Sequence, residues 1–212
     1  YAVYRTASPL TIDGTLTEPA WLKARATRVF RDPNGYALSA RERTRARMVW
    51  DDTYIYVGFT VEDRDIFNDF KGRDATLWKK DAVEVYLDRG ADGKDYVEIQ
   101  VSPTGEIFDA HFSSRRKPNN GPRGKRWLPA AERLTIAGMK VKVTAIGSIN
   151  KRGDSVKDKR YVVEMAIPWK ELPMVEGPPK DGEAWGMNLY RINAAGPAHV
   201  RVSPAGSREA GF

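Results

Sequence analysis

A tryptophan followed by two spaced acidic residues is the part of the sequence best suited to chemistry. Trp78 lies in a polar stretch, and Asp81 and Glu84 follow it at the start of a predicted strand. An indole can stack on the apolar face of a pyranose, while carboxylates and amides bind its hydroxyl groups. Glu84 and, one strand later, Gln100 fall on the side opposite the valine and isoleucine residues. Sugar recognition would use this pattern; the alternative is that Trp78 folds onto the core edge.

Two further polar side chains occur on a later predicted strand, at Asn188 and Arg191. A guanidinium fork can bind two hydroxyl groups or a carboxylate, although an ion pair between strands would use the same chemistry. The candidate sugar-binding residues are therefore Trp78, Asp81, Glu84, Gln100, Asn188 and Arg191.

Missing residue types exclude several kinds of active site. The chain has no cysteine, which removes disulfides, thiolate metal sites, iron–sulfur clusters and thiol nucleophiles. The chain has two histidines, His111 and His199, which are too few for most catalytic zinc sites. A Ser-His-Asp triad would have to use one of these two. The 28 acidic residues are too many for any glycosidase pair to stand out. We therefore predict a protein that is not an enzyme.

Acidic residues also gather in predicted turns, where their oxygens could bind calcium. These groups are Asp51 with Asp52, Glu62 with Asp63 and Asp65, and Asp92 with Asp95. None has the spacing of an EF-hand, and aspartate forms turns without any metal. Structural calcium is one interpretation, and the metal-binding residues stay unassigned.

The net charge of +7, from 35 basic and 28 acidic residues, favours an anionic partner or simply solubility. Much of the excess lies at about 113–133, which we interpret as a long mobile basic loop. Trp127 is its one aromatic residue and no nucleic-acid motif accompanies it, so we expect no nucleic-acid partner. An acidic glycan or an anionic cell surface would suit this loop.

Period-two patterns of apolar residues predict an all-β protein. The predicted strands lie at 44–50, 54–61, 82–87, 96–101, 106–112, 139–146, 161–167 and 185–192. Turn-forming residues make hairpins of the first pair and of the 82–87 and 96–101 pair. With short helical turns near 18–22 and 168–172, the sequence indicates a two-sheet antiparallel β-sandwich forming one domain over 1–212. No apolar run is long enough for a transmembrane segment.

Several motifs, in order along residues 12–193, resemble those of family 9 carbohydrate-binding modules, which belong to the DOMON-like sandwiches. They are IDG at 12–14 with EPAW at 18–21, VWDD at 49–52, IYVGF at 55–59, VED at 61–63, WKKDAVEVYLD at 78–88, VEMAIPW at 163–169 and WGMNLYR at 185–191. The resemblance implies a non-catalytic module that binds a saccharide or polysaccharide. It also implies an extracytoplasmic location (secreted, periplasmic or cell surface), either as part of a larger polypeptide or as a monomer.

Modules of this family clamp a sugar between two tryptophans, and the resemblance maps the first onto Trp78 and a sugar-binding acid onto Glu84. The second tryptophan has no counterpart after Arg191, and Gln100 stands where the family often has a basic residue. The resemblance assigns the core or its edges to Trp21, Trp50, Trp169 and Trp185. It also adds weight to structural calcium.

Two alternatives remain open. The missing second tryptophan favours an accessory or interaction domain of a cell-envelope protein that has lost sugar binding and uses the loop at 113–133. A cytochrome-like branch of the superfamily binds haem, for which His111 with Met139 or Met187 could serve as axial ligands.

Overall fold

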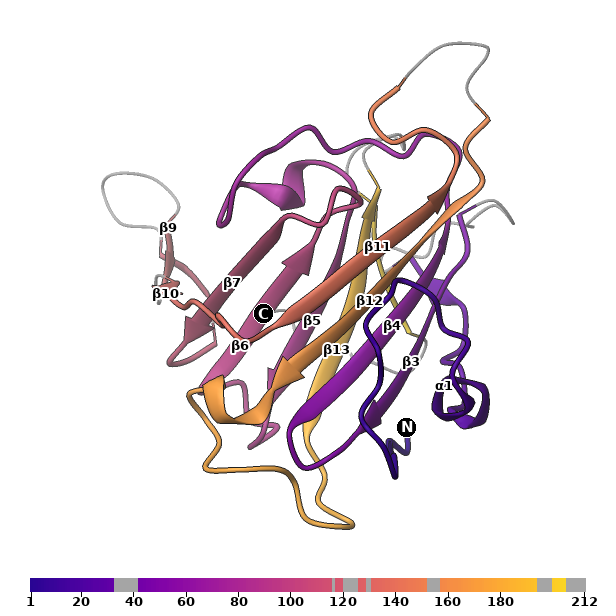
Figure 1. Cartoon of the computed structure of the whole chain (residues 1–212). Coiled ribbons are helices and arrows are strands. Elements are labelled where there is room, and N and C mark those ends of the chain that lie inside the picture. Colours follow the sequence, from indigo (N-terminus) through magenta and orange to yellow (C-terminus); the bar gives the residue numbers. More distant parts are fainter. Residues whose placement is uncertain are drawn as a thin grey trace.

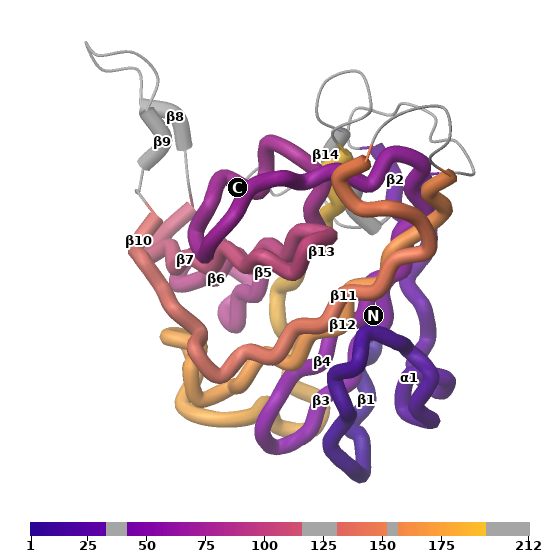
Figure 2. The backbone as a smooth tube through the Cα atoms, turned by 45° about the horizontal axis from the view of Figure 1, so that its top comes forward, coloured from indigo at the N-terminus to yellow at the C-terminus, as the bar shows by residue number. Residues whose placement is uncertain are grey.

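Two β-sheets pack face to face in the computed structural model, as the view in Figure 2 shows. The structure describes residues 1–32, 42–115, 131–151 and 157–193, and the strand backbone at 117–119, 126–128 and 200–204. The all-β sandwich predicted from the sequence is confirmed. No helix within these ranges could span a membrane.

The smaller sheet has the strand order β1-β3-β4-β12-β11. Its strands are β1 (Tyr4–Arg5), β3 (Thr44–Trp50), β4 (Tyr54–Glu62), β11 (Lys140–Ile146) and β12 (Arg160–Pro168). The pairing of β1 with β3 is parallel, and the other pairings in this sheet are antiparallel.

The larger sheet has the order β10-β7-β6-β5-β13-β14-β2, with every pairing antiparallel. Its strands are β2 (Phe30–Arg31), β5 (Ala82–Asp88), β6 (Tyr96–Val101), β7 (Ile107–Phe112), β10 (Glu132–Arg133), β13 (Gly186–Asn193) and β14 (Val200–Pro204). Figure 1 shows β5, β6, β7 and β13 side by side in this layer. Both predicted hairpins are confirmed, as β3 with β4 and as β5 with β6.

The main core lies between the sheets because alternate residues of each strand point inward. Val83, Val85 and Leu87 of β5 are fully buried against residues such as Phe59 and Met165 of the smaller sheet. The opposite set on β5, which includes Glu84, therefore points to the outer face of the larger sheet.

The helices in the described part of the chain are short: α1 (Pro19–Lys23), η1 (Leu77–Lys79) and η2 (Trp169–Glu171). The turns predicted near 18–22 and 168–172 correspond to α1 and η2, whereas η1 had no sequence signal. The segment predicted as a long loop at 113–133 contains the β8 (Lys117–Asn119) and β9 (Arg126–Leu128) hairpin and β10. Strands of two or three residues are too short for a period-two pattern to reveal. The basic side chains at 116–130 lie outside the described residues.

Glu164 of β12 fastens the N-terminal segment to the outer face of the smaller sheet. Its Oε1 accepts a hydrogen bond from the Trp21 indole at 2.9 Å, and its Oε2 accepts the backbone N–H groups of Asp13 and Gly14 at 2.9 and 2.8 Å. Gly14 has φ +87°, and an added Cβ would lie 2.7 Å from a methyl group of Thr144. These contacts give the motifs at 12–14, 18–21 and 163–169 one shared structural role.

Candidate functional site

The outer face of the larger sheet brings four of the six candidate residues together. The strand register places Tyr190, Glu84, Gln100 and Phe108 in one row across β13, β5, β6 and β7. The next row contains Asn188, Tyr86 and Glu98. A stacking platform beside carboxylates and amides is the arrangement that sugar recognition requires.

Trp78 lies on η1 at the edge of this face. It is half-buried, whereas its neighbour Leu77 is fully buried and holds η1 on the core. The indole meets the Phe108 ring edge to face, with centroids 5.3 Å apart and an angle of 73°. Trp78 therefore combines packing on the sheet with a partly exposed ring.

Glu84 and Gln100 form a hydrogen-bonded pair on neighbouring strands. The Gln100 Nε2 donates to Glu84 Oε1 at 3.0 Å and to Glu98 Oε1 at 2.6 Å. The Gln100 Oε1 is buried and accepts no hydrogen bond within the described structure. Such an acceptor suits a ligand hydroxyl group, because a buried polar atom is stabilised by a partner.

The polar residues of this face are buried in the structure. Glu84 and Gln100 are 0 and 1% exposed, and Asn188 is 7% exposed. A saccharide that binds these groups must therefore first displace the protein atoms that cover them. Trp78 is the candidate residue that a ligand can reach directly.

Aromatic residues surround the polar groups, and the sequence reasoning did not single them out. Tyr86 and Tyr190 meet edge to face at 5.6 Å, and Tyr96 stacks on Phe112 at 5.0 Å. Glu98 was missed as well. The same alternation that placed Glu84 and Gln100 on this face could have found all of these residues.

Asp81 and Arg191 lie elsewhere, in a buried ionic cluster between the sheets. Arg191 pairs with Val83, so its side chain points to the inner face, where it is 1% exposed and binds Asp63 at 2.6 Å. The Asp81 carboxylate accepts the backbone N–H of Phe67 at 2.7 Å and is fully buried. Neither side chain can contact a ligand on the outer face while these interactions hold.

The cluster is electrostatically coupled to Tyr161 of β12. Burial raises the pKa of the Tyr161 phenol well above its ordinary value. Burial alone would lower the pKa of Arg191, but Tyr161, Asp63 and Asp81 outweigh it, so the pKa is raised. Arg191 therefore stays charged inside the protein and depends on the carboxylates for compensation.

Several of the acidic residues considered for calcium already bind other groups of the protein. Asp51 accepts backbone N–H groups of Thr53 and Tyr54 and the hydroxyl of Tyr56, and Asp92 accepts the N–H of Lys94. In the described part of the chain, no three acidic or histidine side chains form a group that could hold a metal.

The remaining candidates have packing or surface roles. Trp21, Trp50 and Trp169 are buried, as predicted, and Trp185 is half-buried at the core edge. His111 lies 3.3 Å from Glu132 and 3.4 Å from Asp95 at the β7 edge, an environment of carboxylates. His199 lies outside the described residues.

The chain also matches a known family over nearly its whole length. The model described as "Carbohydrate family 9 binding domain-like" matches residues 12–210. The chain belongs to this family. It is therefore a family 9 carbohydrate-binding module, as the sequence motifs predicted.

Individual relatives are more distant. The chain is 25% identical over 132 residues to exoglucanase XynX of Acetivibrio thermocellus, a match that covers 62% of this chain and 9% of that enzyme. Two structures of a family 9 module from Caldicellulosiruptor kristjanssonii, with cellotriose and with glucose, are 17% identical with TM-scores of 0.59. Each match covers 95% of this chain, and 82 and 84% of the module. This similarity shows a shared fold.

Proposed function

We propose that this module binds a saccharide at the outer face of the larger sheet, with a sugar ring on Trp78 and hydroxyl groups on Glu84, Gln100 and Asn188. The observation that carries the proposal is the partly exposed Trp78 beside the row that contains Glu84 and Gln100. Asp81 and Arg191 are left out because both are held inside the sandwich.

Glucose and short glucans are the ligands to test first, since the structurally similar module was solved with glucose and with cellotriose. With a single tryptophan face in place of two, we expect affinity about tenfold or more below that of a two-sided clamp, from the roughly 1–2 kcal/mol of one aromatic contact. The carboxylates of this face would repel an anionic ligand, so a neutral saccharide is favoured there. An acidic glycan is proposed only for the basic segment at 113–133.

Calorimetric titration with glucose, cellotriose and an acidic oligosaccharide tests the proposal. Trp78→Ala should abolish binding, and Tyr54→Ala, which removes a half-buried aromatic from the other sheet, should leave it intact. Loss of the Phe108 contact should cost Trp78→Ala about 0.5–1.5 kcal/mol beyond the loss of the indole's buried area, so a thermal melt must show that the variant is folded during the titration. Unchanged binding in Trp78→Ala would contradict the proposed site.

The module should not hydrolyse the saccharide that it binds. The family supplies binding domains, and the exoglucanase relative is a much longer protein of which this chain matches 9%. Incubation with cellotriose should release no glucose. An extracytoplasmic location, attached to or accompanying a polysaccharide-degrading enzyme, fits this role and is part of the proposal.

A second candidate function is that of an accessory domain without sugar binding. Two observations favour it: the missing second tryptophan and the burial of the polar residues on the outer face. Absence of binding to every saccharide tested, with retained attachment to an anionic surface that deletion of 113–133 abolishes, would support this alternative.

A further inference from the structure

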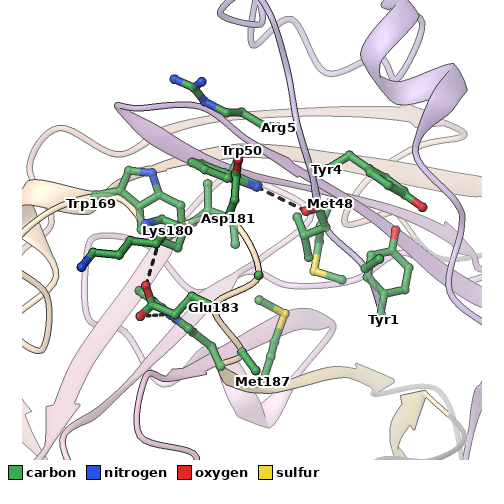
Figure 3. Close-up of a pocket in the computed structure, with 17 residues that line it drawn as sticks. Tyr1, Tyr4, Arg5, Met48, Trp50, Trp169, Lys180, Asp181, Glu183 and Met187 are labelled. Atoms are coloured by element: carbon green, nitrogen blue, oxygen red, sulfur yellow. Dashed lines mark hydrogen bonds between the residues drawn. The ribbon is translucent and has the colours of Figure 1, made fainter.

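A pocket of about 670 Å³ lies at the end of the sandwich opposite Trp78. Its walls come from the N-terminal residues with β1, from β3 and β4, from η2 and from the segment 179–187 (Figure 3). This volume falls within the roughly 300–1,000 Å³ of small-molecule sites. No residue of the outer-face site lines it.

Three tryptophans form much of the apolar wall. Trp169 and Trp185 meet edge to face at 5.3 Å, and Trp50 lines the pocket beside them. Each indole N–H is already bound within the protein, to Val3, Asp51 and Glu183 respectively for Trp50, Trp169 and Trp185. The half-buried Trp185 ring therefore offers a ligand its apolar surface, while Trp50 and Trp169, 8 and 3% exposed, form the wall behind it. Hydrogen bonds must come from other groups.

The polar groups of the pocket carry balanced charge. Arg5 and Lys180 are basic, and Asp181 and Glu183 are acidic. Arg5 is bound to Asp52, and Glu183 to Arg89 and the Trp185 indole. The exposed side chains of Asp181 and Lys180 make no hydrogen bond or ion pair with any described residue, so a carboxylate acceptor and an ammonium donor are available to a ligand.

Aromatic walls with a charge-balanced polar rim match a neutral saccharide better than other small ligands. In this balanced rim an anion or a cation would meet a like charge as well as an opposite one, so a net charge on the ligand brings little gain, and a purely apolar ligand would desolvate Asp181 and Lys180 without compensation. A sugar ring supplies both an apolar face and hydroxyl groups. From this chemistry we propose that the pocket is a second saccharide-binding site.

The two sites are too far apart to be parts of one subsite. Trp78 precedes the first residue of β5, whereas Trp185 precedes Gly186, which pairs with the last residue, Asp88. At about 3.3 Å per residue, the seven residues of β5 separate the two ends by roughly 20 Å. In Figure 1 the segment that carries η1 and the segment before β13 lie at opposite ends of the larger sheet.

The inference takes its ligand class from the proposed function, so the test must report on each site separately. The six tryptophans give separate indole N–H signals in a ¹H–¹⁵N correlation spectrum, which single Trp→Phe variants assign. Titration with cellotriose should shift the signals of Trp50 and Trp185, and these shifts should persist in Trp78→Ala.

The pocket itself is tested by removing an exposed carboxylate that lines it, that of Asp181. Asp181→Ala should raise the cellotriose concentration at half-shift for Trp185 about tenfold, since a hydrogen bond to a charged group is lost. Glu176→Ala removes an exposed acid of the same segment that does not line the pocket, and it should change nothing. Both variants should unfold at the same temperature as the parent.

The outcomes separate the two proposals. Shifts confined to Trp78 would overturn the second site and leave the proposed function standing. Shifts of Trp50 and Trp185 that Asp181→Ala does not weaken would also overturn the second site as assigned. Cellotriose that moves no indole signal at either end would overturn both proposals.

Discussion

Replacing Asp63 by asparagine should destabilise the protein strongly, because Arg191 would lose its charged partner inside the sandwich. The two side chains are 3 and 1% exposed and 2.6 Å apart. The new amide would direct its N–H₂ group at the guanidinium or, turned over, at the backbone N–H of Asp65, and Arg191 cannot lose its proton. Breaking a buried pair costs about 3–5 kcal/mol. We expect the lower end, since Asp81 also compensates Arg191.

A loss of about 3 kcal/mol corresponds to a fall in Tm of roughly 6–12 °C for a chain of this length. Urea unfolding and calorimetry measure both quantities. The matched control is Asp69→Asn, which breaks the surface pair of Asp69 with Lys80 and should cost less than about 1 kcal/mol. Equal losses in the two variants would refute the structural role of the Asp63 and Arg191 pair.

A double variant of the same cluster separates a structural role of Arg191 from a role in saccharide binding. The double variant Asp63→Leu with Arg191→Met removes both charges of the pair and should recover part of the lost stability, because Asp81 stays buried and loses the compensating charge of Arg191. It should bind saccharide as the parent does, because Arg191 points away from the outer face. A folded double variant that does not bind saccharide would show that Arg191 contributes to the binding site.

The remaining predictions concern Glu164, Gly14 and calcium. Glu164→Gln should cost about 1–3 kcal/mol in urea unfolding, since its N–H₂ group would face either the N–H groups of Asp13 and Gly14 or the indole N–H of Trp21. Burial raises the pKa of the Glu164 carboxyl above its ordinary value of 4.5, so the folded state holds the proton more tightly than the unfolded state. The contribution of Glu164 to stability is therefore present at low pH and falls as the pH rises through the folded-state pKa. Glu164→Gln should lack this pH-dependent part of the stability. Gly14→Ala should lower Tm through its positive φ and the contact with Thr144, whereas Gly72→Ala, with positive φ but open space, should cost less. If structural calcium is bound, EDTA should lower Tm and added calcium restore it; an unchanged Tm would exclude that role.

The strands could be predicted because most of them carry a complete period-two pattern. Val83, Val85 and Leu87 alone place β5 on the core, and the same alternation correctly put Glu84 and Gln100 on the outer face. Short elements such as β1, β10 and η1 escaped, since two or three residues cannot establish a period.

The candidate site was only partly predictable, because residue type does not reveal which face a polar side chain takes. Arg191 has the chemistry of a sugar ligand, but its register opposite Val83 turns it inward toward Asp63, 128 residues away in sequence. The pocket near Trp185 draws its walls from several distant segments, so no local pattern could indicate it.

The most direct test of the central claim is a crystal structure of the protein with cellotriose. We predict a sugar ring in stacking contact with Trp78, with hydroxyl groups hydrogen-bonded to the Glu84 carboxylate and the Gln100 amide. A ring bound elsewhere, with Trp78 and the outer face of the larger sheet free of ligand, would contradict the account.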